Sequence, residues 1–185
     1  MKKRHFPQQS TAGFTILEVL VVVVIIGILT AIAAPGWVSF MNRQRAISAK
    51  DQVLQSVRSS QAEAKRRRRR QPIELLPAAT ENDLPELNMN GRVEVLGQGE
   101  IVPGNIQLTT EDNQGNNFNA LVFREDGTVS IDGNDYADFG GAAPELPVMI
   151  TVEAPPNSGR KQCVIIDTIL GSIRSESNDD CEIPD

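Results

Sequence analysis

The chain is poor in the residues on which most catalytic sites depend. Its 185 residues include one histidine, His5, and two cysteines, Cys163 and Cys181. His5 precedes a long apolar run, and the sequence contains neither a serine-nucleophile motif nor a phosphate-cradling loop. These shortages argue against an enzyme, and we expect no cofactor and no metal ion.

Positive charge is scarce in the second part of the chain. Residues 1–70 carry 13 Lys and Arg against three Asp and Glu, whereas residues 71–185 carry five against 21. A surface that binds nucleic acid needs a basic footprint for the phosphates. The acidic part is therefore a poor candidate for broad nucleic-acid binding.

One long apolar run begins at Phe14 and ends at Ala34, and Glu18 is its only charged residue. As a helix it would be about 31 Å long, which matches a bilayer core of about 30 Å. Lys2, Lys3 and Arg4 precede it and predict a cytoplasmic N-terminus, with everything after Ala34 outside.

The run does not have the features of an ordinary secretory signal. Such signals have a shorter apolar core and a small-residue cleavage site after that core. Here the run is too long, Pro35-Gly36-Trp37 is not such a site, and the small residue, Gly13, comes before the run.

The stretch "GFTILEVLVVVVIIGIL" behind a short basic leader resembles the N-terminus of type IV pilins and type II secretion pseudopilins. The resemblance rests on Gly13, Phe14, Glu18 and, near the end of the run, Pro35. It implies that a prepilin peptidase cuts after Gly13 and methylates the new N-terminal amine of Phe14. It also implies four segments, namely a leader (1–13), a transmembrane and assembly helix (14–35), an extracytoplasmic helix (36–71) and a β-rich head (72–185).

Glu18 is costly inside a membrane segment, so it is a functional-site hypothesis by default. The resemblance implies that its carboxylate pairs with the N-terminal amine of a neighbouring subunit during assembly. The alternative is a glutamate tolerated near the interface because it reaches the lipid headgroups.

From Trp37 to about Gln71 the sequence lacks glycine and proline. Ile47, Leu54 and Val57 recur at helical spacing, with Ala46, Ala49, Val53 and Ala64 beside them. This predicts a continuation of the first helix, with a narrow apolar stripe packed on the head. Pro35 should bend or loosen that helix. The predicted fold class is α+β, a long N-terminal transmembrane helix continuing into a helix packed on a small, mostly antiparallel β head, as in pilins.

Five consecutive arginines, Arg66, Arg67, Arg68, Arg69 and Arg70, lie near the expected end of this helix. On a helix they would point all round, so they could not share one binding face. We favour a solvated helix end that pairs with the acidic head and suits the helix dipole. A contact with the acidic surface of another subunit and binding of DNA or an anionic surface are the alternatives.

After Pro72, short β-branched runs alternate with turn residues. The candidate strands are "GRVEVL", "GNIQLTT", "NALVFRE", "GTVSID", "LPVMITVE" and "KQCVIIDTILGSIRS", with a hairpin turn at Asp126-Gly127. "LVFREDGTV" and "CVIIDTILGSIR" resemble the C-terminal half of GspH/FimT minor pilins and pseudopilins. Some of these bind DNA through a Gly-Arg-x-Arg ending, but here one arginine is missing and only Arg174 remains, followed by acidic residues.

Cys163 and Cys181 lie 18 positions apart and predict one disulfide, which requires an oxidising compartment. Closing that loop would stabilise the head by roughly 3 kcal/mol. Two buried free thiols are the alternative. The acidic stretch Asp132–Asp138 does not fit an EF-hand loop, and we expect a solvated turn.

Three functions remain open at this point. The first is a minor pilin-like subunit of a type IV pilus or type II secretion pseudopilus. Its implied partners are the prepilin peptidase, other pilin or pseudopilin subunits, the inner-membrane assembly platform and membrane lipid. The second is a pilus-tip module for DNA uptake or adhesion, and the third is an anchored extracytoplasmic protein that never polymerises.

Overall fold

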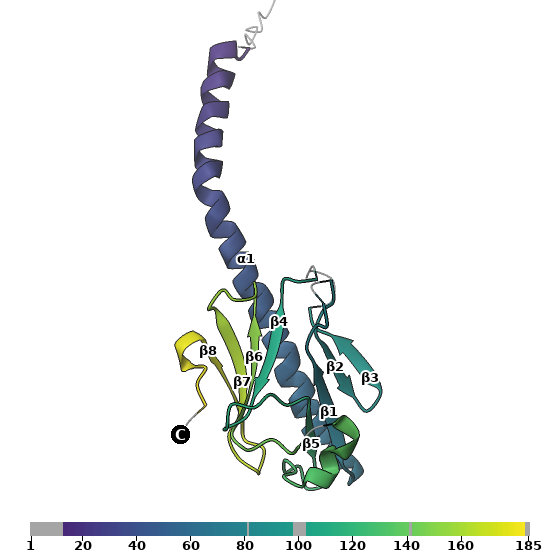
Figure 1. Ribbon diagram of the computed structural model, residues 1–185. Helices are drawn as coiled ribbons and strands as arrows, with labels where there is room; N and C mark the ends of the chain where they lie inside the picture. Colours follow the sequence, from purple (N-terminus) through teal and green to yellow (C-terminus); the bar gives the residue numbers. More distant parts are fainter. Residues whose placement is uncertain (1–12, 81, 98–102, 141, 184–185) are drawn as a thin grey trace, which may run out of the picture. The chain divides into compact units, whose positions relative to one another are not determined.

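The computed structural model describes residues 13–80, 82–97, 103–140 and 142–183. The described part divides into two units, one up to Phe40 and one from Met41 onward. Helix α1 (Ile16–Arg67) contributes to both (Figure 1). The first unit is helical from Ile16 on, and the rest of this section concerns the second unit.

The head from Met41 onward contains two four-stranded sheets, and every strand pairing in its described part is antiparallel. Sheet A has the order β3-β2-β1-β5 and sheet B the order β4-β6-β7-β8. The strands of sheet A are β1 (Gln71–Leu76), β2 (Glu86–Met89), β3 (Arg92–Val95) and β5 (Ala120–Phe123). Those of sheet B are β4 (Gln107–Glu111), β6 (Val148–Glu153), β7 (Lys161–Ile166) and β8 (Ile173–Ser177). The 3₁₀ helices η1 (Gly133–Phe139) and η2 (Asn178–Asp180) complete the head.

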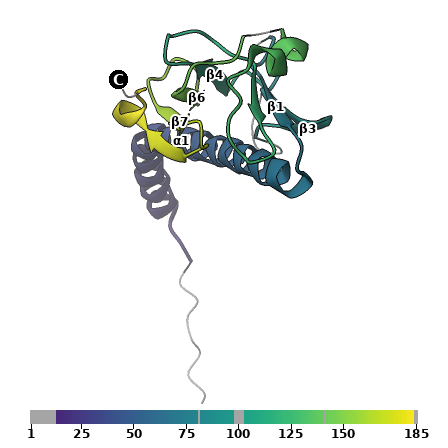
Figure 2. The same cartoon turned by 90° about the horizontal axis from the view of Figure 1, so that it is seen from below.

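The C-terminal half of α1 runs along one side of both sheets (Figure 2). Its buried stripe repeats every three or four residues and consists of Ala46, Ala49, Val53, Ser56, Val57, Ser60 and Ala64. These small side chains allow close approach of the strands, and the apolar ones join the main core with residues from both sheets. The predicted α+β fold, with a helix stripe packed on antiparallel strands, is confirmed.

Gln61 ties the helix to two turns of the head. Its Nε2 group donates to the carbonyl oxygens of Gly127 (3.0 Å) and Gly171 (3.2 Å). Both glycines have positive φ values, 81° and 74°. A Cβ on Gly171 would lie 2.3 Å from Gln61 Nε2, so both the conformation and the close approach require glycine there.

The outer faces of the two sheets are covered by different segments. Tyr136 of η1 packs with Ala120 and Val122 on the outer face of sheet A. Its hydroxyl donates to the Ser130 carbonyl (2.8 Å), and burial raises its pKa to about 12. On sheet B, Cys181 packs with Met149, Cys163 and Ile165. Because both faces are covered, β5 and the last four residues of β7, Cys163–Ile166, are continuous apolar runs.

Several sequence predictions about the elements are wrong. Helix α1 ends at Arg67, and Gln71 begins β1 instead of ending the helix. "GTVSID" forms a single bridge, Phe123 to Val129, because the chain turns into η1 directly afterwards. "KQCVIIDTILGSIRS" makes two strands, since Gly171 closes a turn between them. Strand β1 was missed because Pro72 lies within it, and β2 because it is short.

Asp132–Asp138 is not a solvated turn. Most of it belongs to η1, where Asp135 and Tyr136 are buried. The Asp132 side chain caps this helix by accepting from the Asn134 N–H at 3.0 Å. Asp132 and buried Asp135 therefore serve the local fold. The hairpin turn at Asp126-Gly127 is confirmed, since the Arg124 N–H donates to the Thr128 carbonyl across it.

Candidate functional site

The N-terminal unit presents large apolar side chains to its surroundings over much of its described part. Phe14 is 81% exposed and Ile16 is 89% exposed. The exposed series continues with Leu17, Val19, Leu20, Val21, Val22, Val23, Val24, Ile25, Ile26, Ile28, Leu29, Ile32, Trp37, Val38 and Phe40. By length and composition this segment is apolar enough to cross a membrane. A stretch of 18 residues within α1 has a mean hydropathy of 3.0, and none of these residues is buried.

Such a surface is unstable in water, because exposed apolar area costs about 25 cal/mol per Å² relative to burial. The segment therefore needs lipid or other apolar helices around it. We call the exposed face of residues 14–40 the assembly surface.

Glu18 lies in the first turn of α1 and is the only acidic residue on the assembly surface. Its backbone N–H donates to the Thr15 hydroxyl at 3.2 Å, and the Val19 N–H bonds to the Thr15 carbonyl. Thr15 is thus the N-terminal cap of the helix, and Thr15-x-x-Glu18 has the spacing of a capping box. A carboxylate in the first turn also interacts favourably with the helix dipole.

Gly13 and Phe14 immediately precede the cap and are exposed. Any cleavage between them would leave the new terminus within two residues of the start of α1. Pro35 lies inside the helix. The predicted roles of Gly13, Phe14, Glu18 and Pro35 remain predictions.

The arginine run is divided between elements. Arg66 and Arg67 are in the last turn of α1, and both pair with Glu63, one helical turn earlier. The hydrogen bond from Arg66 and the one from Arg67 lower the pKa of Glu63. Arg68 has a positive φ of 50°, in the left-handed region that ends many helices. Only two of the five arginines are helical. The expectation that all five point in different directions around a helix is therefore wrong.

Arg70 makes the contact with the acidic head that the sequence analysis favoured. It forms an ion pair with Asp135, whose side chain is buried in η1. Asp135 also accepts from the Ser130 hydroxyl. The pairing fixes the chain between α1 and β1 onto the outer face of the head. Arg66, Arg67, Arg68 and Arg69 remain exposed.

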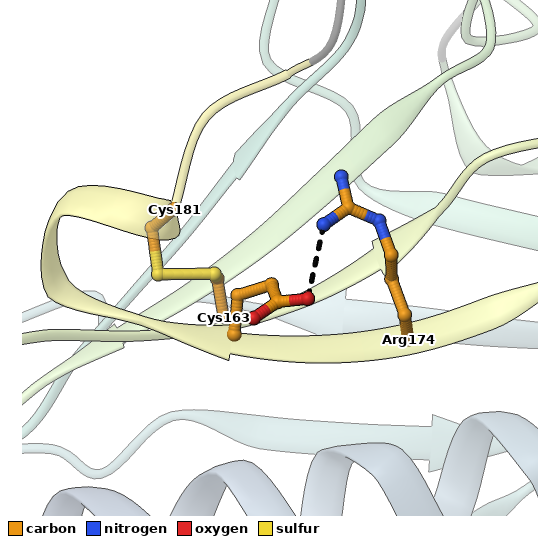
Figure 3. The surroundings of a disulfide bond; sticks show 4 residues. Cys163, Arg174 and Cys181 are labelled. Carbon is orange, nitrogen blue, oxygen red and sulfur yellow. Dashed lines mark hydrogen bonds and ion pairs between the residues drawn. A yellow bond between two sulfur atoms is a disulfide. The ribbon is translucent and has the colours of Figure 1, made fainter.

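Arg174 does not present a free guanidinium. Its Nε donates to both carboxylate oxygens of Asp167 (3.0 and 3.2 Å), and its Nη1 donates to Glu176 at 3.2 Å. Figure 3 shows Arg174 beside the Cys163–Cys181 disulfide on the neighbouring strand. The hydrogen bond to Asp167 raises the pKa of Arg174. The guanidinium is therefore already bound to carboxylates of its own chain.

The two cysteines form the predicted disulfide, with their Cα atoms 5.8 Å apart. It joins buried Cys163 of β7 to Cys181 just after η2, which holds the acidic C-terminal segment against sheet B (Figure 3). The described part of the chain contains no cluster of three potential metal-ligating side chains.

Comparison with known proteins bears on both units. Residues 9–34 match the family model of the prokaryotic N-terminal methylation motif. A crystal structure of the type IV minor pilin FimU of Pseudomonas aeruginosa (strain PAO1), in space group P21, shares the fold at a TM-score of 0.50. It is 15% identical, and the match covers 78% of this chain and 96% of FimU. The chain has an N-terminal methylation motif and a fold shared with a type IV minor pilin.

A second FimU crystal form, in space group P65, matches at 16% identity and a TM-score of 0.42, covering 74% of this chain and 95% of that one. None of the curated proteins compared matches the chain. The matched motif contains Gly13, Phe14 and Glu18, which are the residues that carried the resemblance at the N-terminus.

The sequence analysis missed three interactions that stabilise the structure. The cap residue Thr15 was detectable, because Ser or Thr followed three positions later by Glu is a known helix-start signal. The pairing of Glu63 with Arg66 and Arg67 was also detectable from its spacing of three and four residues. Gln61 had no sequence signal, since its partners lie 66 and 110 positions away.

Proposed function

We propose that the chain is a minor pilin-like structural subunit of a type IV pilus or type II secretion pseudopilus. The observation that carries this proposal is the assembly surface, which begins at the matched methylation motif and leaves its large apolar side chains without partners in the monomer. The subunit first resides in the membrane lipid. It then moves laterally into a fibre, where neighbouring helices replace the lipid around its apolar side chains.

Processing precedes assembly in this proposal. A prepilin peptidase removes residues 1–13 on the cytoplasmic side of the inner membrane and methylates Phe14. An inner-membrane assembly platform then transfers the subunit to the fibre. The head is extracytoplasmic, and the Cys163–Cys181 disulfide supports that location because disulfides persist in oxidising compartments.

Glu18 supplies the selectivity of assembly. Its carboxylate costs free energy in lipid. This free-energy cost is offset when the amine of Phe14 in a neighbouring subunit lies beside the carboxylate. The position of Glu18 in the first helical turn keeps the carboxylate near the cleaved end, where such an amine arrives.

A GspH/FimT-like membership is the finer form of the same proposal. It is supported by the two-sheet head and by the final pair of strands, β7 and β8, which follows the Asp126-Gly127 turn. DNA uptake through the C-terminal arginine is disfavoured, because Asp167 and Glu176 already bind Arg174.

The test is the mass and N-terminal sequence of the full-length protein recovered from membranes. We expect an N-methylated Phe14 at the terminus. An intact Met1, or a cut after Ala34, would contradict the proposal. Gly13→Leu should retain the leader because it places a bulky side chain at the cleavage junction, whereas Gly27→Ala, inside the same run, should be processed normally.

A further inference from the structure

The assembly surface changes in character at its C-terminal end. Its large side chains from Ile16 to Ile32 are all aliphatic, and residues 15–36 contain no aromatic residue. Two aromatic side chains then follow one helical turn apart, Trp37, which is 67% exposed, and Phe40, which is 52% exposed. Their ring centroids lie 6.2 Å apart. We call these two residues the aromatic pair.

The polarity of the chain changes at the same place. Between Glu18 and Trp37, Thr30 is the only residue of the sequence whose side chain carries a polar group. Its hydroxyl donates to the Ile26 carbonyl at 2.9 Å, so the hydroxyl needs no water. Arg43 is the first charged residue after Glu18. The part of the sequence that suits water therefore begins at the aromatic pair.

The distance from the start of α1 to the aromatic pair matches the thickness of a bilayer. At ~1.5 Å per residue, the helix from Ile16 to Trp37 is about 32 Å long. With an average tilt of about 20° it covers about 30 Å along the membrane normal, which is the thickness of the hydrocarbon core. A span that begins at Ile16 therefore reaches the far boundary of the core at Trp37.

Tryptophan suits that boundary for a chemical reason. The indole ring combines a large apolar body with one N–H donor, so it is stable where the acyl chains meet the ester groups of phospholipids. Among the described residues, none accepts a hydrogen bond from the indole N–H of Trp37. An ester carbonyl or a phosphate oxygen of a lipid can accept that bond, whereas an aliphatic side chain at this position would have no donor for it.

We propose that Trp37 and Phe40 bind the phospholipid interface of the outer leaflet, at the level of the glycerol and ester groups. The membrane-embedded part of the subunit then extends from the start of α1 to the aromatic pair. Entry into a fibre requires both rings to leave the lipid. The inference rests on the proposed function, because it concerns the subunit in membrane lipid before assembly.

The test uses the fluorescence of Trp37, which is the only tryptophan of the chain. The full-length protein recovered from membranes is reconstituted, at a low ratio of protein to lipid, into vesicles of phosphatidylethanolamine and phosphatidylglycerol. In separate samples the acyl chains carry bromine close to the ester group or close to the chain end. We expect the shallow bromine to quench the emission at least about twofold more strongly than the deep bromine.

Two variants calibrate the depth scale, and both also carry Trp37→Phe. Ile26→Trp moves the reporter to the middle of the apolar run, and Gln55→Trp moves it to an exposed position on the head. We expect the deep bromine to quench Ile26→Trp more strongly than the shallow one. Acrylamide in the water should quench Gln55→Trp, and neither bromine should do so.

The second member of the pair is tested by Phe40→Trp combined with Trp37→Phe. We expect the same preference for the shallow bromine and a larger effect of acrylamide, because Phe40 lies one helical turn further along α1. A preference for the deep bromine at this position would overturn the inference for Phe40.

Three results for wild-type Trp37 would overturn the inference. The first is quenching by the deep bromine that equals or exceeds quenching by the shallow one. The second is quenching by acrylamide to the level of Gln55→Trp with no effect of bromine, since the pair would then lie in water. The third is protection from all the quenchers, which would show that the pair packs on protein, for example on the helix of a second copy.

The Ile26→Trp reporter separates this inference from the function on which it rests. If the deep bromine quenches Ile26→Trp and Phe14 is N-methylated, any of the three contrary results rejects the interface at the aromatic pair and leaves the proposed function standing. If neither bromine quenches Ile26→Trp, the apolar run does not enter the bilayer, and both proposals fail.

Discussion

At the scale of single residues, Glu18 and Gly171 show two different reasons for a residue's identity. Glu18 lies on an apolar surface where a carboxylate lowers the stability of the isolated subunit in lipid. Gly171 lies where a positive φ and the proximity of Gln61 exclude a side chain. For the first we propose a function in assembly, and the second is explained by the fold of the head.

Glu18→Ala should leave cleavage after Gly13 intact and reduce incorporation into fibres at least about tenfold. The change removes a charge that costs roughly 2.5–3.5 kcal/mol in lipid, but it also removes the carboxylate that we propose pairs with the amine of a neighbouring subunit. The measurement is the mass of the membrane-bound protein together with its amount in sheared fibres. Val19→Ala, on the same helix turn, is the control. Normal fibre levels of Glu18→Ala would contradict the assigned role.

Gly171→Ala should destabilise the head by roughly 1–3 kcal/mol, because alanine is strained at φ 74° and its Cβ displaces Gln61. Thermal unfolding of the detergent-solubilised protein, followed by near-UV circular dichroism of Tyr136, measures the effect. Gly133→Ala should have little effect, since a Cβ there meets nothing within 4 Å. Similar melting temperatures for the two variants would show that the Gln61 contact is unimportant.

At the scale of elements, α1 changes its environment along its length. Its N-terminal part is exposed and apolar, whereas its part from Met41 onward carries a buried stripe of small residues. On the far side of the head, β7 and the segment after β8 are linked by the disulfide. One helix therefore contributes both the exposed apolar surface and part of the core of the head.

Replacing both cysteines, Cys163→Ser with Cys181→Ser, should lower the free energy of unfolding of the head by about 2–4 kcal/mol, because the open 18-residue loop gains entropy when unfolded. Thermal unfolding with and without reductant is the measurement. Reductant should lower the melting temperature of the wild type and leave the double variant unchanged. If the double variant has the same melting temperature as the oxidised wild type, the disulfide contributes nothing to stability.

At the scale of the whole molecule, opposite charges gather in different regions. The basic residues cluster before residue 71 and the acidic ones after it. Within the head, carboxylates also organise loops. Asp112 is buried, which raises its pKa, but hydrogen bonds from the Asn116 and Gln114 backbones outweigh that effect and lower it.

The head should therefore lose stability in acid. A carboxyl whose pKa is lower when folded stabilises the protein above its unfolded pKa, about 3.9 for Asp, and loses that contribution as the pH falls through the lower folded value. Asp112 and Asp126 both belong to this class. We expect the melting temperature to drop below about pH 4. Asp112→Asn should flatten that drop, and the exposed control Asp138→Asn should not. An unchanged profile for Asp112→Asn would refute its contribution.

The sequence by itself determined the features that depend on local pattern. The apolar run, the position of Glu18 after Gly13 and Phe14, the helix stripe, the Asp126-Gly127 turn and the cysteine pair all follow from composition and spacing. Each is a short-range signal, and the helix stripe, the turn and the disulfide are confirmed by the structure.

Only the tertiary structure decided the features that depend on distant partners. Pro72 lies within β1 because β5 pairs with the strand there, whereas the pairing with β2 begins only at Glu74, and Arg70 lies beyond the helix end, where it pairs with buried Asp135. Arg174 is neutralised by Asp167, which a turn brings beside it. The place of β3 at the end of the described sheet A follows from the strand order. Such contacts join residues far apart along the chain, so local periodicity and propensity carry no information about them.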